Sequence, residues 1–278
     1  MWIVERLNGI GSGLTAAALA GIFALPVSAE TQRVEGLSVD RVMVKGSVEV
    51  EITQDDDEVL LIRGTEEQLA RKPFYVEGGT LVLGASREAR KSDFRGVKYK
   101  LSLADLERLE LNGSGEVYVK PLETGKFYAA VEGSGDIRLF DLQADSATLQ
   151  VSGSGDIQAA ELIAPEVRLV LSGSGDIHLQ TLKAEETDAS VNGSGDISLQ
   201  GEGATHLLEI NIVGSGDIDF RDLNAHSIEV NIVGSGTARV GASEELDVTI
   251  MGSGDVVYGG QPGIDQSIMG SGSVTSDD

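Results

Sequence analysis

Apolar and polar residues alternate along most of the chain after residue 108, and the alternation is centred on one tripeptide. Gly-Ser-Gly recurs nine times in this region, and a branched aliphatic residue stands two positions before each of its first glycines. These residues are Leu111, Val131, Val151, Leu171, Val191, Ile212, Ile232, Ile250 and Ile268. The residue two positions earlier is also apolar in most repeats, so the pattern predicts a half-buried strand leading into every turn.

A second apolar series follows each turn, at the fourth and sixth positions after the first glycine. The fourth position holds Val117, Ile137, Ile157, Ile177, Ile197, Ile218, Ala238 and Val256. A leucine recurs at the ninth position in several repeats, as Leu122, Leu142, Leu162, Leu182 and Leu223. The pattern therefore predicts a second inward-facing strand after the turn and a third short side beyond it.

The nine turns are spaced regularly. They open at Gly113, Gly133, Gly153, Gly173, Gly193, Gly214, Gly234, Gly252 and Gly270. A fixed period of this kind indicates a stack of similar coils, and three short aliphatic strands per coil favour a parallel β-helix over a leucine-rich or helical repeat. With coils about 4.8 Å apart, eight intervals extend roughly 40 Å, so we expect an all-β rod that exposes side walls rather than deep clefts.

Three regions follow from this reading. Residues 1–29 resemble a secretory signal peptide, with an apolar stretch and a small-residue cleavage site at Val27-Ser28-Ala29. Residues 30–110 alternate without the strict motif, and we expect an N-terminal β cap or irregular first coils, with Gly46-Ser47 as a degenerate turn. Residues 111–275 are the regular repeats. No segment of the mature chain is long and apolar enough to cross a membrane as a helix.

Composition narrows the range of partners. The formal net charge is -24, so nucleic acid is not expected as a ligand because its binding requires a basic surface. The chain has no cysteine, which excludes disulfides and thiolate metal sites. Glycine makes up 36 of the 278 residues, and its concentration at the turns is explained by sharp corners that need positive φ or a close backbone approach.

Two features together resemble one family of exported bacterial proteins. They are the block from Val42 to Ile52 (Val-Met-Val-Lys-Gly-Ser-Val-Glu-Val-Glu-Ile) and the train of Gly-Ser-Gly-Asp-Ile units. The chain is similar to the GIN domain, described as an autotransporter adhesin head domain, over roughly residues 34–275. The resemblance implies a right-handed parallel β-helix of about 20-residue coils, a role in cell-surface adhesion and no catalytic residues. Glu116, Thr237 and Ser273 depart from the family's aspartate.

An aspartate follows most of the turns, and stacking places these carboxylates in a column. They are Asp136, Asp156, Asp176, Asp196, Asp217 and Asp255. Stacked carboxylates about 5 Å apart repel one another, and calcium would relieve the repulsion while taking oxygen ligands. Alternatively, each carboxylate accepts hydrogen bonds from the backbone of its own turn. The column is a candidate calcium site under the first hypothesis and a structural feature under the second.

Other candidate chemistry is sparse. His206 and His226 stand eight residues before successive turn glycines, so we expect them to be vertical neighbours, either as two surface histidines or as part of a zinc or nickel site. Arginines occupy different columns, and no carboxylate is singular enough to predict a catalytic acid. The scattered aromatic residues are interpreted as core filling or edge capping; they are Tyr118, Phe127, Tyr128, Phe140, Phe220 and Tyr258.

The sequence therefore predicts an exported, acidic binding or adhesion module without a cofactor, acting through the walls of the rod. A surface glycan or an envelope protein is the expected partner, and the periplasm or the outer cell surface is the expected location. Two alternatives stay open: a structural protein of the envelope, and a polysaccharide-active lyase or hydrolase. The oligomeric state is also open.

Overall fold

The computed structural model describes residues 3–7, 29–88 and 93–277 of the chain. Most of the expected signal peptide lies outside these residues. Its strand β1 (Ile3–Leu7) is described, and it pairs antiparallel with β2 (Glu30–Glu35). None of the described segments forms a helix with the length and apolar character that a bilayer crossing needs.

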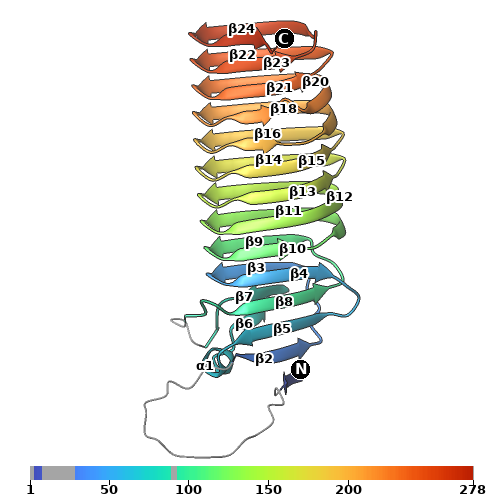
Figure 1. Ribbon diagram of the computed structural model, residues 1–278, viewed down its shortest axis with the longest axis vertical. Helices are drawn as coiled ribbons and strands as arrows, with labels where there is room; N and C mark the ends of the chain where they lie inside the picture. Colours follow the sequence, from blue (N-terminus) through green and yellow to red (C-terminus); the bar gives the residue numbers. More distant parts are fainter. Residues whose placement is uncertain (1–2, 8–28, 89–92, 278) are drawn as a thin grey trace, which may run out of the picture.

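The repeats form a tall parallel solenoid, as predicted (Figure 1). Strands that end at the Gly-Ser-Gly turns make one wall, which we call the approach sheet: β9 (Arg108–Gly113), β11 (Leu122–Gly133), the second half of β12 (Asp136–Gly153), β14 (Glu166–Gly173), β16 (Glu186–Gly193), β18 (Gly203–Gly214), β20 (Leu223–Gly234), β22 (Glu245–Gly252) and β24 (Gly263–Gly270). Strands that follow the turns make the opposite wall, the exit sheet: β10 (Glu116–Val119), the first half of β12, β13 (Ile157–Ile163), β15 (Ile177–Lys183), β17 (Ile197–Leu199), β19 (Ile218–Phe220), β21 (Thr237–Ala242), β23 (Asp255–Gly259) and β25 (Ser273–Ser276).

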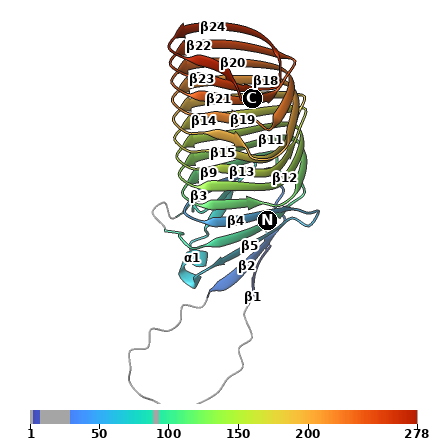
Figure 2. The ribbon, with the colours of Figure 1, turned by 45° about the horizontal axis from the view of Figure 1, so that its top comes forward.

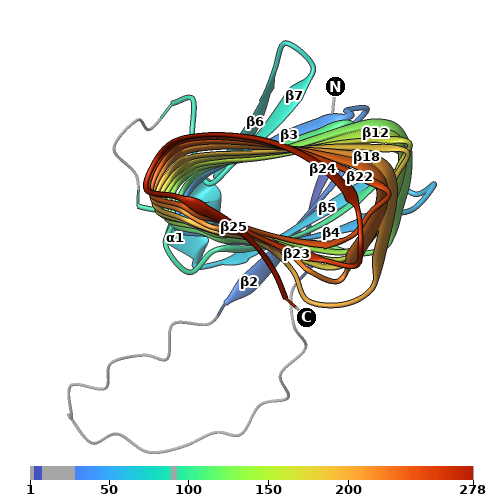
Figure 3. The same ribbon diagram turned by 90° about the horizontal axis from the view of Figure 1, so that it is seen from above.

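The cross-section is a flattened ring, and the coil is right-handed. Seen from the C-terminal end, the chain runs along β24, turns, and returns along β25 in an anticlockwise sense while it rises toward the viewer (Figure 3). The expected third side is formed by extensions of strands at the ring's other edge, where Leu122, Leu142 and Leu162 lie in register. These observations confirm the all-β, right-handed parallel β-helix.

The core consists of aliphatic ladders that run the length of the rod. Each ladder stacks the same repeat position, as in Ile137, Ile157 and Ile177, which pair coil to coil and are fully buried. The ladder before the turns behaves in the same way: Val151 and Leu171 are partners and are also fully buried. The interior coils bury equivalent positions because side chains along each strand alternate between the core and the outer wall.

Close stacking of the turns explains both glycines of each tripeptide. The first glycine has positive φ, as at Gly153 (+140°), and a Cβ there would lie 2.3 Å from the carbonyl oxygen of Gly133. A Cβ on the second glycine, Gly155, would lie 2.1 Å from the carbonyl oxygen of Gly135. Successive turns therefore leave no room for a side chain at either position.

The N-terminal region contains one degenerate coil. Strands β3 (Arg41–Gly46) and β4 (Glu49–Gln54) flank the predicted turn, and Gly46 pairs with Gly113 of the first regular coil. The hydroxyls of Ser47 and Ser114 are 2.8 Å apart. Residues 41–54 therefore extend the solenoid by one coil below the first Gly-Ser-Gly.

Below this coil the order of the chain reverses. Strands β7 (Thr80–Leu83) and β8 (Lys98–Leu103) come later in sequence, yet they pair in parallel with the lower edges of β3 and β4. Antiparallel strands then close the end: β5 (Val59–Gly64) pairs with β8 and β2, and β6 (Phe74–Glu77) pairs with β7. The helix α1 (Glu66–Ala70), begun by a capping box between Thr65 and Gln68, buries Leu69 against this end.

Candidate functional site

The outer face of the exit sheet carries side chains at the odd positions after each turn, because the even positions face the core. The fifth position forms a polar column, and consecutive members are coil-to-coil partners: Tyr118, Arg138, Gln158, His178, Ser198, Asp219 and Arg239. The seventh position forms a neighbouring column of Lys120, Phe140, Ala160, Gln180, Gln200 and Arg221. The two columns together make a continuous wall of different side chains on a regular backbone.

A hollow of about 460 Å³ lies between these two columns. Its principal side chains are those of Arg138, Phe140, Gln158, His178, Gln180 and Gln200. Ala160 also lines it, at the position equivalent to Phe140 one coil further on, and its short side chain leaves space beside the ring. The hollow thus combines one aromatic ring with several amide groups, contributed by four successive coils.

Phe140 differs from the other two phenylalanines of the repeats. Its side chain is 41% exposed, whereas Phe127 and Phe220 are buried in the core as predicted. The ammonium group of Lys120 lies 4.5 Å from the centre of the Phe140 ring, which is within range of a cation–π contact. The interpretation of Phe140 as core filling or edge capping is therefore wrong. Strand parity could have revealed this, since Leu139 faces the core and the next residue must face outward.

Polar contacts hold the N-terminal side of the hollow. Arg138 Nη1 donates to the hydroxyl of Tyr118 (2.8 Å), and that hydroxyl donates to Glu116 Oε2 (2.6 Å). Arg138 also lies 3.7 Å from Glu116 and 3.8 Å from Asp136. The hydrogen bond to Glu116 raises the pKa of Tyr118, and burial adds to the rise. The guanidinium of Arg138 is thus already paired with acids and a phenol.

The C-terminal side of the hollow is held by His178. Its Nδ1 lies 2.8 Å from the hydroxyl of Ser198, and its Nε2 lies 3.8 Å from Asp176. The contact with Ser198 joins two successive coils, and the contact with Asp176 lies within one coil. The wall is therefore ordered before any ligand arrives, which lowers the entropic cost of binding.

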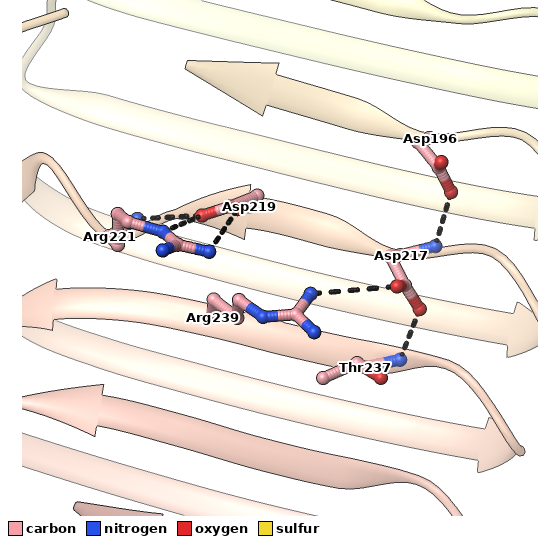
Figure 4. A network of polar contacts seen from close by, with 6 residues as sticks. All are labelled: Asp196, Asp217, Asp219, Arg221, Thr237 and Arg239. Carbon is pink, nitrogen blue, oxygen red and sulfur yellow. Dashed lines mark hydrogen bonds and ion pairs between the residues drawn. The ribbon is translucent and has the colours of Figure 1, made fainter. Parts of the chain in front are cut away.

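The predicted aspartate column exists, but its hydrogen bonds run between coils. The amide of Asp176 donates to Oδ1 of Asp156 (3.0 Å), and the amide of Asp196 donates to Oδ1 of Asp176 (2.9 Å). The series continues through Asp217 to the amide of Thr237 (Figure 4). The backbone donor thus belongs to the next coil rather than to the aspartate's own turn, and each carboxylate ties two coils together.

The two ends of the aspartate column differ from its middle. Asp136 lies near Arg138, and Asp255 accepts from both the amide and the hydroxyl of Ser273. Within residues 3–7, 29–88 and 93–277, no group of three histidine, cysteine or acidic side chains is placed to hold a metal ion. Calcium binding by this column stays a prediction.

Two ion pairs occupy the exit sheet near Asp217. Arg239 lies 3.5 Å from Asp217, and Arg221 donates two hydrogen bonds to Asp219 (Figure 4). Burial acts to raise the pKa of Asp219, but the hydrogen bonds and the charge of Arg221 outweigh it, and the pKa is lowered. Since these side chains are partly exposed, the pairs contribute little to stability.

The two histidines are stacked neighbours, as predicted. The rings of His206 and His226 are parallel within 4° and their centres are 4.7 Å apart. His226 Nδ1 lies 3.3 Å from Glu244 Oε2. Parallel stacking directs the ring nitrogens of both residues outward in the ring planes instead of toward one shared point, so this geometry favours two surface histidines over a zinc or nickel site.

Comparisons with solved structures find the same architecture in proteins of the bacterial genus Parabacteroides. The chain is 28% identical to a "putative lipid binding protein" from Parabacteroides distasonis, with a TM-score of 0.65 over 91% of this chain and 98% of the other. A "putative adhesin" from the same species is 19% identical, with a TM-score of 0.68 over 90% and 98%. A "putative adhesin" from Parabacteroides merdae is 17% identical, with a TM-score of 0.68 over 91% and 98%. The latter two likenesses show the fold alone.

The sequence also matches a family model directly. No curated protein matches the chain significantly. The model described as "Putative auto-transporter adhesin, head GIN domain" matches residues 39–200 and 149–262, which include the degenerate coil and nearly all of the repeats. The chain therefore belongs to this family of GIN domains.

Proposed function

We propose that the protein is an exported, non-catalytic binding module that holds a neutral glycan in the hollow beside Phe140. The observation that carries the proposal is the exposed Phe140 ring next to a row of glutamine amides. The apolar face of a sugar ring packs against an aromatic side chain, while its hydroxyls exchange hydrogen bonds with amide donors and acceptors. The hollow offers both kinds of contact on a rigid wall.

Charge favours a neutral glycan over an acidic one. The formal net charge of -24 opposes the approach of an acidic polymer. The guanidinium group of Arg138 could bind the carboxylate of an acidic sugar, yet it already contacts Tyr118, Glu116 and Asp136. The glutamine amides of Gln158, Gln180 and Gln200 are uncharged and suit hydroxyl groups.

The name of the 28% identical relative suggests lipid as a second ligand class. The packing of this chain supports it less well. The core ladders are filled by aliphatic side chains such as Leu149, Leu169 and Ile177, all fully buried, so an acyl chain could enter only by displacing them. We therefore favour the glycan.

Export rests on the leader-like segment and its cleavage pattern. We propose that the mature chain begins at Glu30 and works in the periplasm or on the outer cell surface. Sequencing the N-terminus of protein recovered from cell fractions tests both statements at once. An intact leader in the cytoplasmic fraction would contradict them.

The test of the glycan is a binding array followed by calorimetric titration of any hit. Phe140→Ala should weaken binding about fivefold, corresponding to roughly 1 kcal/mol of aromatic contact. Ala160→Phe retains the Phe140 ring but fills the hollow beside it, and it should abolish binding. Val233→Ala removes an equally exposed apolar side chain from the approach sheet and should leave binding unchanged.

Three outcomes would contradict the proposal. A blank array would favour a structural role in the envelope. Binding that survives both Phe140→Ala and Ala160→Phe would place the ligand elsewhere on the rod. Release of new reducing ends or of unsaturated products from a bound polysaccharide would favour the enzyme alternative.

A further inference from the structure

The C-terminal end of the rod is built like an interior coil, yet nothing in the described part of the chain covers it. Strand β22, one coil below, alternates buried and exposed residues, whereas all eight residues of β24 are exposed. Ile264, Gln266 and Ile268 pair with Leu246, Val248 and Ile250, which are buried. The terminal coil thus presents core positions to solvent. In the view tilted toward this end, β24 is the uppermost strand of its wall (Figure 2).

The exposed end is apolar. Ile264 and Ile268 are 39% and 37% exposed, and Met269 beside them is 62% exposed. Met251, Val233 and Val213 continue from Met269 down the approach sheet in register, each about half exposed. In the N-terminal coils the same column holds the polar residues Asn112, Glu132, Ser152, Ser172 and Asn192. Apolar exposure is therefore concentrated toward this end.

The end also offers unpaired backbone. Among the described residues, β24 pairs only with β22 and β25 only with β23. The upper edge of β24 therefore presents N–H and C=O groups without a strand partner. Such an edge accepts another strand readily, and natural proteins usually cover it or place charges on it.

We infer that this end binds the same end of a second copy of the chain. Rotation about a two-fold axis perpendicular to the rod brings β24 against its own copy in the antiparallel sense, which supplies both the missing hydrogen bonds and an apolar surface for Ile264 and Ile268. The interface closes on itself, so the product is one dimer rather than a filament. Two rods joined this way form a single longer rod.

The distribution of charge along the rod favours an end-to-end contact between two copies over a side-by-side one. The net charge of -24 opposes the side-by-side approach of two rods. Within β24 and β25, however, Asp265 is the only charged residue, and Asp277 and Asp278 follow β25. The equivalent interior strands β14 and β15 carry three charged residues, Glu166, Arg168 and Lys183. Strand β24 thus brings a single charged side chain from each copy into the contact.

Head-to-tail stacking is disfavoured by the other end of the rod. There the antiparallel strands β2 and β5, the hairpin of β6 and β7 and the helix α1 occupy the space beneath the parallel coils (Figure 1). A flat coil edge such as β24 would meet irregular structure instead of a matching edge.

The test combines sedimentation equilibrium with small-angle X-ray scattering of the purified protein, over a range of concentrations. We expect the mass to rise with concentration from that of one chain, which is 29.1 kDa for all 278 residues, toward about twice the single-chain value, with the maximum dimension increasing close to twofold. Ile268→Lys should hold the protein as a monomer. Its side chain is already partly exposed, so the fold should survive, and circular dichroism checks this.

Val233→Lys is the matched control. It introduces the same charge at an exposed aliphatic residue on the approach sheet, away from the terminal coil, and should still dimerise. The inference would be overturned by a monomer at every concentration, by a dimer no longer than the monomer, by a dimer that Ile268→Lys does not affect, or by a mass that continues to rise beyond the dimer.

Discussion

The two ends of this solenoid meet the same physical problem in different ways. At the N-terminal end, antiparallel strands, a hairpin and a short helix cover the lowest parallel coil, and residues such as Leu60 and Leu101 are buried there. At the C-terminal end, no described strand covers the last coil, and every residue of β24 is exposed. This coil lies nearest the viewer in Figure 3. The comparison shows that the repeat alone is enough to build the coils, whereas covering an end requires additional sequence that does not repeat.

The free-energy cost of a defect should therefore depend on where in the stack the affected coil lies. In a stack where each coil contacts only its neighbours, an interior defect disrupts two interfaces, whereas a defect in the last coil disrupts one and can be relieved by fraying. Equivalent substitutions at the two places should therefore have unequal effects.

The largest expected difference is between two turn glycines. A Cβ at Gly175 would lie 2.0 Å from the carbonyl oxygen of Gly155, and one at Gly272 would lie 2.2 Å from that of Gly254. The clashes are similar, but Gly175→Ala should destabilise the protein by about 3 kcal/mol, whereas Gly272→Ala should cost less than about 1 kcal/mol because the last coil can peel away. Urea unfolding of both variants measures this.

Gly125→Ala is the control for the turn glycines. A Cβ at this position meets nothing closer than Asp145 Oδ2 at 3.7 Å, so the substitution should be close to neutral. Equal losses from Gly175→Ala and Gly272→Ala would mean that the terminal coil is as firmly held as the interior.

A smaller difference is expected between two isoleucines of one ladder. Ile250 is fully buried, and Ile268, its partner one coil above, is 37% exposed. Ile250→Ala should cost about 2 to 4 kcal/mol, and Ile268→Ala less than about 1 kcal/mol, because the second removes area that is already partly in water. Thermal melts at a dilution where the protein is monomeric give both values. Similar losses would show that Ile268 is covered in the isolated chain.

Removing the hydroxyl group of Tyr99 should destabilise the N-terminal cap. Tyr99 donates a hydrogen bond to the carbonyl oxygen of Pro73 (2.7 Å) and accepts one from the amide of Gly84 (3.1 Å). The Gly84 amide also donates to the Pro73 carbonyl oxygen (3.1 Å). Tyr99→Phe therefore removes two hydrogen bonds but leaves these backbone groups paired with each other, and it should cost about 1 kcal/mol. Urea unfolding measures the loss, and an unchanged midpoint would show that the hydroxyl does not hold the cap.

The same residue gives the cap a pH dependence. Burial raises the pKa of Tyr99, although the hydrogen bond from Gly84 opposes the rise. A group whose pKa is raised by folding stabilises the native state fully below its unfolded value, near 10, and loses that contribution as the pH rises through the folded value. The wild type should therefore lose stability above about pH 10 more steeply than Tyr99→Phe.

The regular coils could be predicted from the sequence because their register is local. Each Gly-Ser-Gly pairs with the next tripeptide along the chain, so the period alone places Ile157 on Ile137 and Gly173 on Gly153. The cap could not be predicted in this way. The position of β7 beneath β3 and the antiparallel pairing of β5 with β8 depend on contacts between segments that share no repeat.

The exposure of Phe140 could have been predicted from the sequence, although the residue was interpreted as core filling or edge capping. Strand parity places Phe140 outward beside Leu139, and the fixed period places Ala160 and Gln180 in the same column. The hydrogen bonds of the aspartate column were harder to predict, since turn geometry decides whether the carboxylate of Asp156 reaches its own backbone or the amide of Asp176 in the next coil.

Amide hydrogen exchange, followed by mass spectrometry at high dilution, tests the contrast between the two ends most directly. The amides of β24 should exchange fastest among the repeats, protection should rise over the first coils below it, and the cap strands β5 and β8 should exchange as slowly as the middle of the rod. Cap amides that exchange as fast as those of β24, or a terminal coil as protected as β14 in the isolated monomer, would contradict the account.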